Sequence, residues 1–132
     1  MEYNKIPCIT AVGVKIEKEI RLKNCTDGRI KKEYLLSKPL TREFAAFFQD
    51  YGETRVINGL KKPFFTFLIP GCLNIKGFFT EPEIEVWYVP EFLCSGEEFL
   101  ALLVAAYGMP SAGPHLASVH RQLLAQVSGD RQ

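Results

Sequence analysis

The chain has 132 residues, enough for one domain with its own hydrophobic core, and its hydrophobic fraction of 47% excludes a globally disordered chain. Its 16 basic and 15 acidic residues give a net charge of +1, which argues against a strongly electrostatic partner such as bulk nucleic acid. No apolar run reaches the ~18 residues of a transmembrane helix, and the first residues lack the apolar region of a secretory signal. We therefore expect a cytoplasmic protein with no membrane partner.

The first predicted element is a half-buried strand from Val12 to Lys23, in which even-numbered apolar residues alternate with odd-numbered charged residues. The sequence NCTDGR then turns the chain, and a second strand runs from Ile30 to Leu36. A loop with an odd number of residues, Asp27 to Arg29, keeps the apolar residues on one face and places Leu22 opposite Tyr34.

A helix is predicted next, in the stretch LTREFAAFFQDYG (40–52). Thr41 is its expected N-cap, and Gly52 is its expected C-terminal stop. Aromatic residues form one stripe along it with the spacing of a buried helix face, namely Phe44, Phe47, Phe48 and Tyr51.

Four short apolar runs follow, at 55–60, 64–69, 73–79 and 83–89, and turn residues separate them. The stretch KKPFFTFLIPGCLNIKGFF (61–79) holds five phenylalanines. We expect these rings to pack as core against the aromatic helix stripe. The alternatives are a groove for a partner or ligand, or a surface that stacks nucleic-acid bases. The KGFF sequence is a near match to an RNA-recognition strand, but Thr80 stands where the next aromatic residue would be.

A second helix is predicted over 94–108, with Ser95 and Glu98 as a capping box. Its apolar residues lie nearly all round the helix, so it should be covered on more than one side. A third helix is predicted from Pro114 to Val127, and it carries a narrow apolar stripe of Leu116, Val119, Leu123 and Val127.

This order predicts an α+β fold, with a mainly antiparallel sheet and two or three helices on one face. The central part has the order of the split βαβ unit of ferredoxin-like folds, with an added N-terminal hairpin. The Gly- and Pro-rich stretch GMPSAGP (108–114) divides the chain into a single α+β domain, 1–108, and a C-terminal helical segment and tail, 109–132.

Residues able to carry chemistry are few. Cys94 precedes the second helix and is a weak candidate for a nucleophile, with His115 or His120 as its base. At least three of the four cysteines, which include Cys8, are expected to be small buried residues rather than ligands or disulfides.

Three acidic residues, Glu81, Glu83 and Glu85, alternate along one strand and are a weak candidate site for a divalent metal. A solvated outer sheet face is the commoner reason for such a row. The chain has neither a Gly-rich phosphate loop nor a nucleophile elbow, and we expect no cofactor.

The excess of apolar and aromatic residues over convergent polar groups favours a small non-enzymatic binding or assembly module. The alternative is a small enzyme that uses Cys94 with a histidine, or a metal held by the glutamates. The expected partner is a second copy of the chain, in a homodimer, or another protein. Its expected contact residues are Trp87, Tyr88, Phe92, Leu116, Val119 and Leu123.

Overall fold

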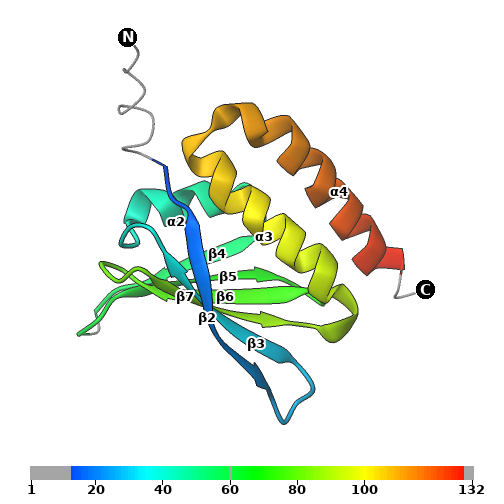
Figure 1. Ribbon diagram of the computed structural model, residues 1–132, viewed down its shortest axis with the longest axis horizontal. Helices are drawn as coiled ribbons and strands as arrows, with labels where there is room; N and C mark the ends of the chain where they lie inside the picture. Colours follow the sequence, from blue (N-terminus) through cyan, green and yellow to red (C-terminus); the bar gives the residue numbers. More distant parts are fainter. Residues whose placement is uncertain (1–12, 60, 130–132) are drawn as a thin grey trace.

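The computed structural model describes residues 13–59 and 61–129 (Figure 1). Cys8, Val12 and Leu60 lie outside the described residues. The elements are β2 (Ile16–Asn24), β3 (Ile30–Leu36), α2 (Arg42–Phe48), β4 (Glu53–Ile57), β5 (Phe64–Ile69), β6 (Leu73–Phe78), β7 (Glu83–Tyr88), α3 (Leu93–Gly108) and α4 (Gly113–Gly129). Short 3-10 turns, Pro90–Phe92 and Pro110–Ala112, precede α3 and α4. Within the described ranges, no helix is long and apolar enough to span a membrane.

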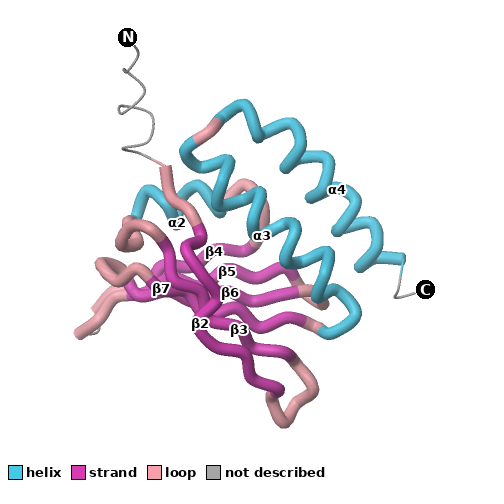
Figure 2. Tube along the Cα trace, in the orientation of Figure 1, coloured by secondary structure: helices cyan, strands magenta, loops and turns pink. Residues whose placement is uncertain are grey.

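The strands form one six-stranded sheet in the order β2-β3-β7-β6-β5-β4, and every neighbouring pair is antiparallel. Figures 1 and 2 show α2, α3 and α4 on the same side of this sheet. The predicted α+β class, with helices on one face of an antiparallel sheet, is confirmed. Four strands rather than two lie between α2 and α3, so the ferredoxin-like arrangement is not confirmed.

The core lies between the sheet and the helices, because alternate residues of the central strands point toward the helices. Phe48 of α2 packs edge-on against Phe65 and Phe67 of β5, with ring centroids 5.6 and 5.2 Å apart. Thr41 caps α2 as predicted, since its Oγ1 accepts a hydrogen bond from the Phe44 N–H at 3.1 Å. The other two phenylalanines of the stripe, Phe44 and Phe47, contact Tyr107 of α3.

Helix α3 lies between the sheet and α4, which covers its outer side (Figure 1). The predicted stripe of α4 is buried in this contact, with Leu116 and Leu123 only 0% and 1% exposed. His120 adds a polar anchor, because its Nε2 donates a hydrogen bond to the backbone oxygen of Tyr51 at 2.8 Å. The segment after Gly108 therefore contributes to the same core as the rest of the chain. The division of the chain into a domain, 1–108, and a C-terminal segment, 109–132, stays a prediction.

The predicted alternation of the first strand holds at its start, where Val14 is buried, Ile16 is half-buried and Lys15 and Glu17 are exposed, but it is wrong further along. Leu22 is 53% exposed and Ile20 is 37% exposed, and Leu22 pairs with Lys32 instead of Tyr34. The register of β2 shifts twice, between Ile16 and Lys18 and again between Glu19 and Arg21. Each bulge moves the following residues to the other face, so a strict period of two cannot hold along this strand.

The predicted capping box of the second helix is also wrong. Helix α3 begins at Leu93, its N-cap is Phe92, and no side chain caps it. The 3-10 turn that starts at Pro90 leads directly into the helix, so Ser95 already lies inside the first turn. Its hydroxyl instead lies 3.5 Å from the Oε1 atom of Gln126 in α4.

Candidate functional site

The face of the sheet that points away from α2, α3 and α4, called the open face below, is not covered by any of these helices. Cross-strand pairing arranges its side chains in rows. The middle row, from β4 to β2, is Arg55, Thr66, Lys76, Glu85, Glu33 and Arg21. The next row, in the same order, is Glu53, Leu68, Asn74, Trp87, Lys31 and Lys23.

Among the residues that the structure describes, three aromatic side chains lie on the open face, and each has a cation over its ring. Phe64 and Phe78 are paired across β5 and β6, with ring centroids 5.6 Å apart. The Lys76 ammonium lies 4.7 Å from the centroid of Phe64 and 5.0 Å from that of Phe78. The Lys31 ammonium lies 5.1 Å from the ring of Trp87. These distances are those of cation–π contacts, and the lysine stems cover part of the apolar ring surface.

This arrangement corrects the prediction that the whole phenylalanine cluster is core. Phe65, Phe67 and Phe79 are buried, with exposed fractions of 0%, 0% and 8%. Phe64 and Phe78 are half-buried and point to the other side of the sheet. Strand alternation alone separates the two sets, because neighbouring residues of a strand face opposite sides.

Charges of both signs surround the aromatic residues of the open face. Lys31 forms ion pairs with Glu33 at 3.5 Å and with Glu85 at 3.4 Å. Glu33 also lies 3.9 Å from Arg21. The face is therefore a mixed surface, in which apolar rings are set among paired charges rather than in a single-sign field.

Of the contact residues that the sequence predicted, Trp87 lies on the open face and is half-buried. The others are buried within the chain and pack in its hydrophobic core, namely Tyr88, Phe92, Leu116, Val119 and Leu123. Trp87 is thus the one predicted contact residue that this fold leaves partly exposed.

The candidate thiol and imidazoles lie apart. Cys94 is exposed at the start of α3, and the Ser95–Gln126 contact places the end of α4 beside it. His115 is in the first turn of α4 and so lies about 16 Å along the helix axis from Gln126, at about 1.5 Å per residue. The His120 ring stacks on Phe99, with centroids 5.5 Å apart, and its Nε2 bonds to the Tyr51 backbone. This geometry gives His120 a packing role.

The three acidic residues of the predicted metal site also lie apart. Glu83 and Glu85 share the open face, whereas Glu81 precedes β7 and pairs with Lys62 at 2.6 Å. Among the residues described here, no group of three His, Cys, Asp or Glu side chains is placed to hold a metal ion.

The prediction that at least three cysteines are buried is wrong. Cys72 is buried, Cys25 is half-buried and Cys94 is exposed, and all three are free thiols. Burial raises the pKa of the Cys72 thiol to about 11, so this thiol stays protonated at neutral pH. Cys94 differs from the expectation because it lies on the solvent side of the first turn of α3.

No pattern in the sequence predicts the polar cluster that lies beneath α3. Lys32, only 9% exposed, forms ion pairs with Glu97 of α3 and with Glu19 of β2, the latter at 3.1 Å. The hydrogen bond with Glu97 raises the pKa of Lys32. Beside it, the hydroxyls of Tyr34 and Tyr88 lie 2.8 Å apart. These groups pair with one another, so the cluster ties β2, β3 and β7 to α3 and serves the packing of the fold.

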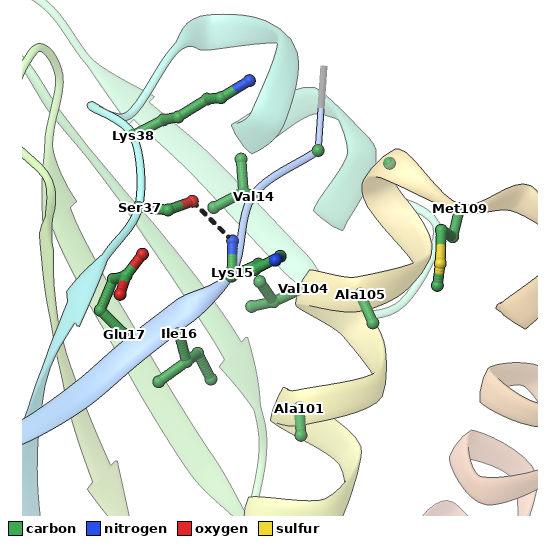
Figure 3. A pocket seen from close by; sticks show the side chains of 12 residues that line it. Val14, Lys15, Ile16, Glu17, Ser37, Lys38, Ala101, Val104, Ala105 and Met109 are labelled. Carbon is green, nitrogen blue, oxygen red and sulfur yellow. Dashed lines mark hydrogen bonds between the residues drawn. The ribbon is translucent and has the colours of Figure 1, made fainter. Parts of the chain in front are cut away.

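An apolar groove of about 590 Å³ lies between α3 and the start of β2 (Figure 3). Its apolar lining includes Val14, Ile16 and Val104. The hydroxyl of Ser37, at its wall, already accepts a hydrogen bond from the Lys15 N–H at 2.8 Å. A small ligand is usually oriented by several convergent polar groups, and the described lining of this groove offers mainly apolar contacts.

Comparison of the chain with protein-family models, with curated proteins and with solved structures finds no match.

Proposed function

We propose that this chain is a non-enzymatic binding module that acts through the open face of its sheet. One observation carries the proposal: Phe64, Phe78 and Trp87 lie on a face that no described helix covers. Large aromatic residues on a surface favour a partner, because burying them removes apolar area from water and fixes few rotatable bonds. Among the described residues, the thiol and imidazole groups that could support catalysis lie apart or are engaged in packing, which favours binding over an enzymatic role.

The partner is a protein surface rather than a nucleic acid. Glu33, Glu83 and Glu85 lie on the same face as the lysines and would repel phosphate groups. A protein partner can match both signs, since interfaces pair charges around an apolar centre. The free thiols of Cys25, Cys72 and Cys94 fit a reducing compartment, and we place the module in the cytoplasm on that ground.

Hydroxyl-radical footprinting tests this proposal, because radicals oxidise aromatic side chains only where solvent reaches them. The purified full chain, at high dilution, is compared with the same chain in an extract of its own cells. We expect Trp87 and Phe78 to lose most of their reactivity in the extract. Met109 and Leu124, which are 50% and 41% exposed on the helical side, serve as internal controls and should keep theirs. Equal oxidation of Trp87 in the dilute chain, in the extract and in the purified chain at high micromolar concentration would show that the open face is not a binding surface.

A further inference from the structure

One pair of opposite charges at the centre of the open face, Lys76 and Glu85, complements the same pair of a second copy. The sheet has six strands, and its centre lies between β6 and β7. A two-fold axis parallel to the strands at this centre would place β6 of one copy over β7 of the other, with equivalent rows facing each other. Lys76 of each copy would then face Glu85 of the second copy. In the next row, Asn74 would face Trp87.

The other simple two-fold axis is unfavourable. An axis along the middle row would place each residue of that row against its own copy. Lys76 would then face Lys76 and Glu85 would face Glu85, and like charges brought together across an interface oppose association. The central Lys76–Glu85 pair therefore favours the first of these two arrangements.

We propose that the partner of the open face is a second copy of this chain, packed sheet to sheet about the axis that runs between β6 and β7. This inference rests on the proposed function and specifies its partner. The interface is isologous, so each Lys76–Glu85 contact occurs twice. Packed sheets lie about 10 Å apart, a separation that long side chains such as Lys76 and Glu85 span together.

The size of the contact predicts a weak dimer. Four central strands about 4.8 Å apart and three rows about 6.8 Å apart cover roughly 400 Å² of each copy. Such an area lies below the ~800 Å² per partner of stable complexes and within the range of transient ones. We therefore expect a weak, reversible dimer.

Charge reversal in two separate chains tests this geometry by sedimentation equilibrium. Lys76→Glu alone places acid against acid in its own dimer, and Glu85→Lys alone places base against base. We expect each variant to be monomeric at concentrations where the wild type is dimeric. An equimolar mixture should form a heterodimer. At one contact the new acid at position 76 meets the new base at position 85, and at the other contact the unchanged Glu85 meets the unchanged Lys76.

Helix-side variants of equal net charge serve as the control. Arg121→Glu and Glu98→Lys alter residues of α4 and α3 on the opposite side of the sheet. Each should dimerise like the wild type, and mixing the two should not change the extent of dimerisation. Should charge reversal unfold the chain, Lys76→Gln and Glu85→Gln should each weaken the dimer, whereas Arg121→Gln should not.

Any one of three results would overturn the proposed dimer. The wild type stays monomeric, the open-face variants dimerise like the wild type, or their equimolar mixture stays monomeric. The proposed function is judged separately. If Trp87 is protected from radicals in extract but the purified chain is monomeric, the open face binds another protein and only the inference fails.

Discussion

The hydroxyl pair of Tyr34 and Tyr88 allows a quantitative test of the polar cluster beneath α3. The two oxygens lie 2.8 Å apart, and the residues are only 6% and 0% exposed. Within the part of the chain that the structure describes, each hydroxyl has the other as its hydrogen-bond partner. Tyr34→Phe or Tyr88→Phe alone therefore leaves one buried hydroxyl unsatisfied, which costs about 1–3 kcal/mol. The double substitution removes both groups and should cost less than the sum of the single changes.

Urea unfolding of the wild type, both single variants and the double variant measures this coupling. We expect the double variant to be at least about 1 kcal/mol more stable than additivity predicts, with an unchanged dependence on urea. Tyr107→Phe is the matched control, because the ring of Tyr107 packs against Phe44 and Phe47 and keeps these contacts in phenylalanine. Additive losses, or single losses below about 0.5 kcal/mol, would refute the claim that the two hydroxyls satisfy each other.

Three further predictions concern pH, caps and thiols. Burial holds the pKa of Tyr88 above its ordinary value of 10.0, so the unfolded chain releases this proton at lower pH than the folded chain does. The free energy of unfolding, measured by urea titration, should therefore fall as pH rises past this value, and it should fall less in Tyr88→Phe. Equal slopes in the two proteins would contradict the burial of Tyr88. Thr41→Ala removes the cap of α2 and should lower the free energy of unfolding by about 1 kcal/mol, whereas Ser95→Ala removes no cap and should change it by less than about 0.5 kcal/mol. Equal losses of the two variants in urea titrations would contradict the cap assignment. Iodoacetamide should label exposed Cys94 in the folded protein long before Cys72, and mass spectrometry showing the reverse order would contradict the burial of Cys72.

Elements are predictable from the sequence where one periodicity holds throughout. The stripe of α4 and the aromatic face of α2 follow the helical repeat, and their central residues are buried as expected. In β2 the bulges change the register, and no local pattern marks where they fall. The predicted start of α3 is wrong because Ser95 and Glu98 match a capping box, whereas the turn from Pro90 already sets the helix direction.

Only part of the candidate surface can be predicted from the sequence. Alternation assigns Phe64 and Phe78 to one face and Phe65 and Phe67 to the other. Which of these faces is covered depends on where the helices pack, a tertiary property that no single strand encodes. The alignment of Lys76 beside Glu85 likewise requires the pairing of β6 with β7.

The fluorescence of Trp87 tests the central claim most directly, because it is the one tryptophan of the chain and lies on the open face. Its emission maximum and its quenching by acrylamide can be followed as the purified protein is concentrated from nanomolar to high micromolar levels. We expect the emission to shift to shorter wavelength and the quenching to fall as dimers form, and Lys76→Glu alone should show neither change. Emission and quenching that stay constant while sedimentation reports a dimer would place the contact elsewhere and contradict the assignment of the open face.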